Sequence, residues 1–154
     1  MAVTSIWPVK SRLDHVINYA RNPAKTRERS LVSQASLHAI DNVIEYAADT
    51  IKTEERAYVS CLNCREDNAA VQMMETKRYW GKTDGRLCFH GYQSFAAGEV
   101  TAETAHAIGV KLAEELWGER FEVVIATHCN TGHYHNHFVI NSVSWADGYK
   151  FNNS

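Results

Sequence analysis

Four histidines lie in the ten positions from His128 to His137, and they are half of the eight histidines in the chain. The stretch reads HCNTGHYHNHFVIN, and its apolar end, residues 138–140, predicts a β-strand. Because a strand repeats every two residues, His135 and His137 leave the same face about 7 Å apart. Residues 121–127 predict a second strand, and turn-forming residues separate the two. The stretch therefore predicts a β-hairpin.

The hairpin would bring His128, at the end of its first strand, over His135 and His137. Three converging imidazoles suit a divalent cation that keeps positions open for water or substrate. A structural cluster of half-buried histidines is the alternative, although burying several unpaired imidazoles costs solvation energy. We expect the first arrangement, with these three histidines as metal ligands. The residues expected to orient an imidazole or the substrate are His133, Asn130 and Asn141.

Three neutral imidazoles would leave the charge of such a cation uncompensated, and an electropositive centre suits an anion such as a phosphodiester. A zinc lyase or hydrolase that activates water would also fit. Tyr19 lies on the polar stripe of an expected helix, ahead of a basic segment, and is a candidate nucleophile toward phosphorus. The residues alone leave the reaction open.

The composition limits the class of protein to which the chain can belong. A chain of 154 residues with 45% apolar and 22% charged residues is one ordinary globular domain and not a disordered segment. With a net charge of −2 there is no global basic field, so any DNA binding must be local. No signal peptide or membrane span is visible, and the four cysteines do not resemble a secreted disulfide framework, so we expect a cytoplasmic protein. Because the sequence stops soon after a strand and a turn, we expect residues 1–154 to be one domain, truncated at its C-terminus, of a longer protein.

Helical and strand patterns alternate along the chain. The expected strands are 3–9, limited to an edge by Pro8, then 56–63, 86–95 and the two of the hairpin. The expected helices are 11–21, 36–49, 67–80 and 101–117. In the last helix we expect Thr101 to be the N-cap. Its expected buried face consists of Ala105, Ile108, Leu112 and Leu116. This order predicts an α+β fold, with helices packed on a mainly antiparallel sheet.

Three blocks resemble a known family. The stretch ATHCNTGHYHNHFVINSVSW resembles the histidine motif of relaxases, the mobilisation nucleases of conjugative and mobilisable elements, which are HUH endonucleases. The stretch SIWPVKSRLDHVINYARNPAKT resembles the start of relaxases from integrative elements of Gram-positive bacteria, and HGYQSFAAGEVTAETAHAIGVKLAEELWGERFEVVIATH is similar too. The blocks cover most of the chain, in the family's order. The resemblance implies a ferredoxin-like palm as the fold.

The resemblance also implies a reaction. Mg²⁺ or Mn²⁺ would be held by His128, His135 and His137 and would polarise the scissile phosphate of single-stranded DNA at the transfer origin. Tyr19 matches the family's nucleophile, which leaves a 5′-phosphotyrosyl link and a free 3′-hydroxyl. Accessory relaxosome proteins and a coupling protein are the further partners implied.

Two positions depart from the family pattern. Many relatives have Asp two residues after the first motif histidine, where this chain has Asn130, which accepts no proton. The middle of the HxH is Asn136 and not a hydrophobic residue. Two alternatives therefore stay open. One is a degenerate domain that binds the transfer origin without cutting, and the other is an unrelated three-histidine metallohydrolase. The expected DNA contacts are Ser94, which matches a DNA-contacting serine, and the basic side chains near Tyr19, namely Arg12, Lys25, Arg27 and Arg29.

Overall fold

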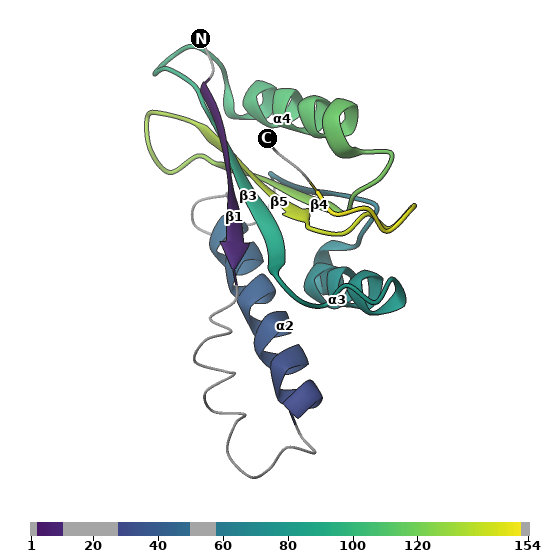
Figure 1. Cartoon of the computed structure of the whole chain (residues 1–154). Helices are drawn as coiled ribbons and strands as arrows, with labels where there is room; N and C mark the ends of the chain where they lie inside the picture. The colour runs from purple at the N-terminus through teal and green to yellow at the C-terminus, as the bar shows by residue number, and fades with distance from the viewer. Residues whose placement is uncertain (1–2, 11–27, 50–57, 152–154) are drawn as a thin grey trace.

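The computed structural model describes residues 3–10, 28–49 and 58–151, which form a five-stranded antiparallel sheet with three helices packed on it (Figure 1). The strands are β1 (Val3–Lys10), β2 (Val59–Leu62), β3 (Arg86–Ser94), β4 (Val123–His128) and β5 (His135–Asn141). The helices are α2 (Glu28–Ala47), α3 (Ala69–Tyr79), which follows the 3₁₀ turn η2 (Glu66–Asn68), and α4 (Ala102–Trp117). The expected α+β class is confirmed.

The strand order is β1-β3-β5-β4-β2, and every neighbouring pair is antiparallel. β4 and β5 form the expected hairpin, in which His128 lies opposite His135. β5 is therefore the central strand, and β3 pairs along its other side. Pro8 lies in the edge strand β1, as expected for a residue without a backbone N–H.

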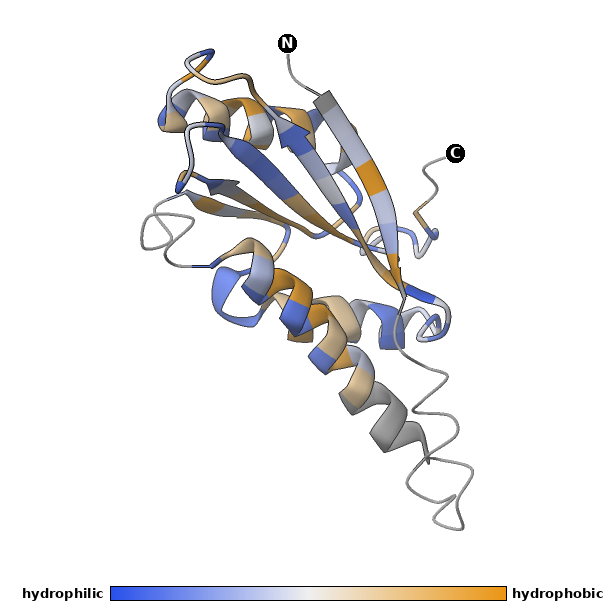
Figure 2. Ribbon diagram, turned by 90° about the vertical axis from the view of Figure 1, so that its left-hand side faces the viewer, coloured by the Kyte–Doolittle hydropathy of each residue, from blue (hydrophilic) through white to orange (hydrophobic). Residues whose placement is uncertain are grey.

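Alternation along the strands divides the core into two layers. On one face, α2 and α3 pack over Val124, Ala126 and Val139. On the other face, α4 packs over Ile125 and Phe138, and Trp117 closes that layer. Figure 2 shows the apolar positions along the strands and on α2 that this packing uses. The histidines at odd positions of β5 therefore belong to the α2 face.

Two helices differ from the expectation. α2 begins at Glu28 and not at residue 36, and Ile40, Ile44 and Ala47 form its buried apolar stripe. Thr101 caps α4 as expected, since its hydroxyl accepts from the Thr104 backbone N–H.

The expected buried face of α4 is wrong, apart from Ala105, which is buried, and Leu112, which packs against the core. Ile108 and Leu116 are 37% and 56% exposed. The residues that face the sheet are Ala105, Gly109, Ala113 and Trp117. Their spacing of four is a helical stripe, but its small members carry little hydrophobic signal.

The expected helix 11–21 lies outside the described residues, and so do Tyr19, Arg12, Lys25 and Arg27. Arg29 lies in the first turn of α2. Of the helices that the structure describes, none is long and apolar enough to cross a membrane.

Candidate metal centre

Three imidazoles gather on the α2 face of the sheet, one from each of its adjacent strands β3, β5 and β4. His128 and His137 are stacked, with ring centroids 3.9 Å apart, and His90 lies 5.1 Å from His137. All three are buried, with exposed fractions between 6% and 8%. The cluster forms because β3 and β4 both pair with β5, which places odd positions of β5 beside even positions of the two flanking strands.

The ring nitrogens of this cluster have partners on the protein. His90 Nε2 and His137 Nδ1 are 2.9 Å apart and share a hydrogen bond. His128 Nε2 donates to the backbone carbonyl of Ala47 at 2.7 Å. Burial lowers the pKa of His90, and the nearby His128 lowers it further. A neutral imidazole is the form that binds a metal ion, so the environment keeps His90 ready for ligation.

The donor set fits a divalent cation in part. Two ligand atoms at right angles about an ion with 2.0–2.1 Å bonds lie about 3 Å apart, which is close to the His90–His137 nitrogen separation. Among the described residues, however, no group of three His, Cys, Asp or Glu side chains converges closely enough to hold an ion. His90 and His137 are thus joined by a hydrogen bond, and the rings of the cluster would have to turn before three of them could hold one ion.

His135 lies on the same face but outside the ring cluster. It stacks on Tyr92, with centroids 5.5 Å apart, and is half-buried. In the sheet it lies opposite His128 on one side and Ser94 on the other. Burial lowers the pKa of His135, as does the nearby His133. The structure thus brings His128 and His137 of the expected triad into contact. The third member, His135, pairs with His128 in the sheet, but its ring stacks on Tyr92.

The three expected orienting residues lie apart from the imidazoles. Asn130 and His133 are exposed in the loop between β4 and β5, where the Thr131 hydroxyl donates to the His133 carbonyl. Asn141 is fully buried at the far end of β5. Its amide nitrogen donates to Glu122 Oε1 at 2.8 Å and to the Met73 carbonyl at 3.2 Å, and its oxygen accepts from Lys77. Asn141 therefore anchors α3 to the sheet.

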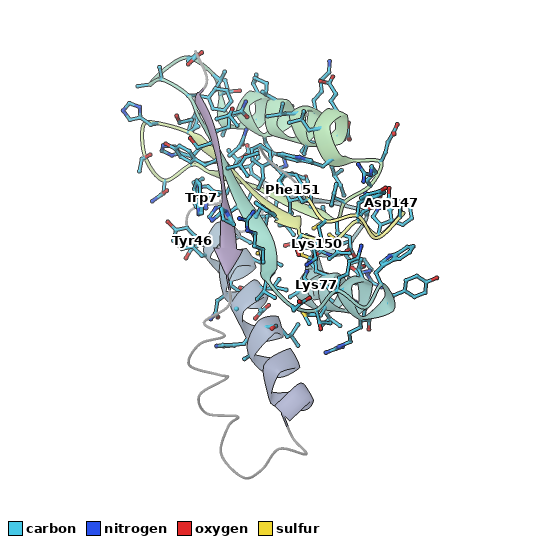
Figure 3. The ribbon with its side chains drawn as sticks, in the orientation of Figure 1. Trp7, Tyr46, Lys77, Asp147, Lys150 and Phe151 are labelled. Atoms are coloured by element: carbon cyan, nitrogen blue, oxygen red, sulfur yellow. The ribbon has the colours of Figure 1, made fainter. Side chains whose placement is uncertain are left out.

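Two residues of the site were not predicted from the sequence, His90 and Tyr46. The Tyr46 ring meets His90, His128 and His137 edge-on, at centroid distances of 6.2, 6.2 and 6.1 Å. Trp7 packs on the other side of His90 at 4.9 Å. Figure 3 shows Trp7 and Tyr46 together beside β1, apart from Lys77 on α3. A phenol and an indole thus border the histidine cluster.

The sequence does contain a signal for Tyr46. Residues 14–26 and 41–53 share the pattern D-x-V-I-x-Y-A-x-x-x-x-K-T, with seven identities in thirteen positions. The first copy holds Tyr19 and the second holds Tyr46 at the same place. No comparable signal exists for His90, because its role depends on the pairing of β3 with β5.

The polar residues on the opposite face form a closed network under α4. Asn136 Nδ2 donates to Gln93 Oε1 at 3.0 Å and to the Ala105 carbonyl at 2.7 Å, and its Oδ1 accepts from the Thr127 hydroxyl. Thr127 in turn contacts His106, whose Nε2 lies 2.7 Å from the Ser60 hydroxyl. This network explains a polar residue in the middle of the HxH, because Asn136 joins β5 to α4.

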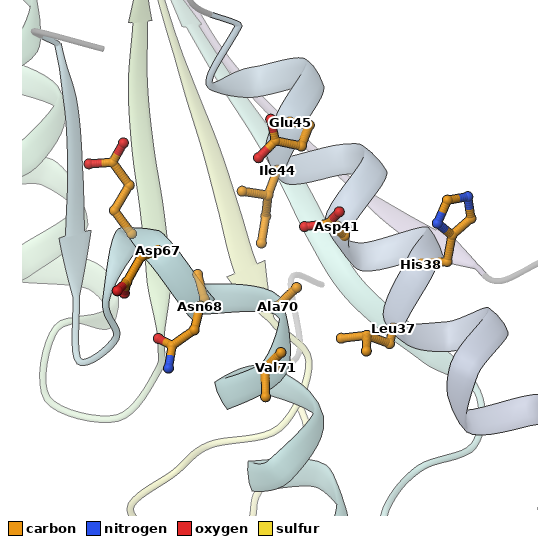
Figure 4. Close-up of a pocket in the computed structure, with 11 residues that line it drawn as sticks. Leu37, His38, Asp41, Ile44, Glu45, Asp67, Asn68, Ala70 and Val71 are labelled. Atoms are coloured by element: carbon orange, nitrogen blue, oxygen red, sulfur yellow. The ribbon is translucent and has the colours of Figure 1, made fainter. Parts of the chain in front are cut away.

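A cavity of about 350 Å³ lies between α2 and the start of α3 (Figure 4). Apolar side chains and four carboxylates line it, the carboxylates being those of Asp41, Glu45, Glu66 and Asp67. Carboxylates at this density repel phosphodiesters, so the cavity is unsuited to DNA. The sheet histidines do not line it.

Comparisons with known proteins agree with the resemblance in the sequence. A family model described as relaxase, MobA/VirD2-like, nuclease domain, matches residues 46–154, more than half of the chain. Protein rlx of Staphylococcus aureus is 42% identical over 95 residues, which are 62% of this chain and 28% of that protein. The group II intron-interrupted relaxase LtrB of Lactococcus lactis subsp. cremoris is 32% identical over 147 residues, 92% of this chain and 26% of that protein. The chain thus spans about a quarter of the length of these relatives.

Proposed function

Because the chain belongs to the MobA/VirD2-like relaxase nuclease family, we propose that it nicks one strand of DNA at a transfer origin, at a specific site, for conjugative transfer or mobilisation. The observation that supports this best is the gathering of His90, His128 and His137 on one sheet face, inside the region that the family model matches. Imidazoles that could hold a cation, beside half-exposed aromatic rings, suit a phosphodiester chain.

The proposed nuclease depends on Mg²⁺ or Mn²⁺. His128 and His137 would hold the ion, together with a third imidazole, which is His135 by the resemblance or His90 by its distance to His137. When bound, the cation would draw electron density from the scissile phosphate. The Ala47 carbonyl holds the His128 ring in one orientation.

The attacking group is a tyrosine phenol, for which the N-terminal resemblance gives Tyr19. Attack forms a phenolic O–P bond and breaks the P–O3′ bond, so the products are a 5′-phosphotyrosyl adduct and a free 3′-hydroxyl. The adduct keeps the energy of the phosphodiester, which allows the strand to be rejoined after transfer.

The DNA partner would be bound by Ser94, the last residue of β3, which lies opposite His135, and by Arg12, Lys25, Arg27 and Arg29. Contacts to phosphates of this kind weaken steeply with salt. Accessory relaxosome proteins and a coupling protein would be partners of the whole protein, acting in the cytoplasm. His133, Asn130 and Asn141 remain proposed auxiliary residues, the first two from the loop above His135.

A labelled oligonucleotide series tests the proposal. Single strands tiled across the transfer origin of the parent element are incubated with the protein and Mn²⁺, then resolved on a denaturing gel. We expect one strand and one position to be cut, with label retained on the protein, and no product in EDTA. Binding without cutting under every divalent cation would favour the degenerate binding domain that Asn130 suggests. Family membership leaves an unrelated metallohydrolase without support.

A further inference from the structure

We propose that Tyr46, at the end of α2, supplies the phenol that attacks the scissile phosphate. The inference rests on the proposed function and decides which of two similar tyrosines performs it. Two independent observations carry it, the position of the Tyr46 ring and the repeated sequence around it.

The position is the first observation. The Tyr46 ring lies nearly equidistant from three imidazoles, between 6.1 and 6.2 Å from each, so it is centred over the cluster. Its side chain is still 54% exposed, which leaves room for a DNA strand between solvent and the histidines. A nucleophile must lie at the centre that holds the phosphate and also be open to the substrate. Tyr46 meets both conditions.

The backbone fixes this position. The residue after Tyr46 is Ala47, whose carbonyl accepts the hydrogen bond from His128 Nε2, and the Ala47 side chain is fully buried. The end of α2 is therefore attached to the histidine cluster one residue away from the phenol. Tyr92 also touches the cluster, but it belongs to β3 itself and its ring stacks on His135. A ring that is stacked on a neighbouring side chain has less freedom to reach an in-line position.

The repeat is the second observation. The pattern that resembles the family's nucleophile segment around Tyr19 recurs 27 positions later around Tyr46. The region matched by the family model begins at residue 46. The same local sequence thus occurs twice, and in the copy that the structure describes, the tyrosine borders the imidazoles.

The step is a transesterification that needs no further reactant. The Tyr46 phenolic oxygen forms a bond to phosphorus while the P–O3′ bond breaks. The phenolic proton passes to solvent, and the departing 3′-oxygen takes a proton up from solvent. Nothing is oxidised or reduced, and the reverse attack by a 3′-hydroxyl restores the strand.

Peptide mapping of the adduct tests the assignment. Wild-type protein is reacted with the cleavable oligonucleotide and Mn²⁺, digested with nuclease and trypsin, and analysed by mass spectrometry. Cleavage after Lys and Arg separates the tyrosines, with Tyr19 on peptide 13–21 and Tyr46 on peptide 30–52. We expect the nucleotide on peptide 30–52. Modification of peptide 13–21 alone would overturn the assignment and leave the proposed function standing.

Substitution gives the second measurement. In Tyr46→Phe we expect the yield of adduct to fall by at least about a thousandfold, as for the loss of a covalent nucleophile. Tyr79→Phe is the matched control, because Tyr79 is an exposed helical tyrosine, on α3. Circular dichroism and Mn²⁺ binding equal to wild type would show that the Phe variant is folded with its metal centre intact. Full adduct in Tyr46→Phe would overturn the inference, whereas no adduct in wild type would overturn the proposed function itself.

Discussion

The two faces of the sheet handle polar side chains in opposite ways. Under α4, Asn136, Thr127 and His106 hydrogen-bond to one another and to Gln93, and the Asn136 side chain is fully buried. Under α2, the imidazoles of His128 and His137 stack on each other and are bonded to the Ala47 carbonyl and to His90, and half-exposed aromatic rings border them. Thr127 and Asn136 adjoin His128 and His137 in the same two strands, β4 and β5.

This difference separates structure from function in a single motif. Buried amides and hydroxyls that satisfy one another stabilise a fold and specify its register. The imidazoles on the other face lie beside a half-exposed tyrosine ring, and imidazole is a side chain that commonly binds a metal ion. In HNH, the middle residue therefore holds the sheet to its helix, and the outer two face the candidate site.

The largest effect should follow a change on the histidine face. His137→Gln keeps the volume and a polar atom toward His90 but removes an imidazole from the centre of the cluster. We expect Mn²⁺-dependent nicking to fall by about a thousandfold, since a polarising cation contributes several kcal/mol to the transition state. The free energy of unfolding should change by less than about 1.5 kcal/mol. Nicking assays and urea denaturation of the same preparation check both parts, and an active variant would contradict the contrast between the faces.

The neighbouring residue should show the reverse. Asn136→Ala removes the partners of Thr127, Gln93 and the Ala105 carbonyl, and it leaves buried polar groups unsatisfied. We expect a loss of about 2–4 kcal/mol in the free energy of unfolding, measured by urea denaturation. The control is Asn130→Ala, at an exposed loop position, which should stay within about 0.5 kcal/mol. Equal losses for the two variants would mean that the network is not stabilising.

How much of the fold and of the candidate site could be predicted from the sequence depends on how far apart in the chain the interacting residues lie. The hairpin follows from local alternation and turn residues, and the Thr101 cap follows from one residue and its position. The α2 stripe follows from helical spacing, although the segment before it has no such stripe and its helical state was missed. Local patterns therefore gave the elements and two of the clustered histidines, His128 and His137.

The rest required information about pairing or packing. His90 joins the cluster only because β3 pairs with β5, and residues 47 positions apart cannot be matched by periodicity. The buried side of α4 was misjudged because Gly109 and Ala113 are chosen for their small size and not for hydrophobicity. Tyr46 could have been predicted from the sequence, since comparison of the chain with itself shows a second copy of the tyrosine segment.

A substitution in the packing of α4 against the sheet should have a smaller effect on the free energy of unfolding. A Cβ on Gly109 would lie 2.5 Å from Asn136 Nδ2 and 2.7 Å from its Cγ. We therefore expect Gly109→Ala to cost about 1–3 kcal/mol through overpacking, measured by urea denaturation. Gly132→Ala is the control, because nothing lies within 4 Å of its added methyl group. In an Asn136→Ala background the cost of Gly109→Ala should shrink, and an unchanged cost would show that the two residues do not interact.

The smallest effect concerns a third polar cluster, formed by Lys77, Asn141 and Glu122. It lies on the histidine face, and its side chains are hydrogen-bonded to one another as in the α4 network. Lys77 is fully buried, donates to Asn141, and has a pKa lowered to about 8, chiefly by burial. The unfolded chain has the ordinary lysine pKa near 10.5, so between these values it binds more protons than the folded protein. Stability from this group therefore rises with pH across that window, and it is reduced below pH 8, where the buried amine is charged.

Lys77→Met removes this dependence. We expect the stability difference, wild type minus variant, to increase by about 1 kcal/mol per pH unit between pH 8 and 10, measured by urea denaturation at each pH. Burial raises the pKa of Cys88 to about 12, which lowers stability at high pH in both proteins and largely cancels in the difference. Lys111→Met, at an exposed position of α4, is the control, because its surroundings hardly change on unfolding. A stability difference between wild type and Lys77→Met that does not change with pH would mean that the amine is solvated in the folded protein.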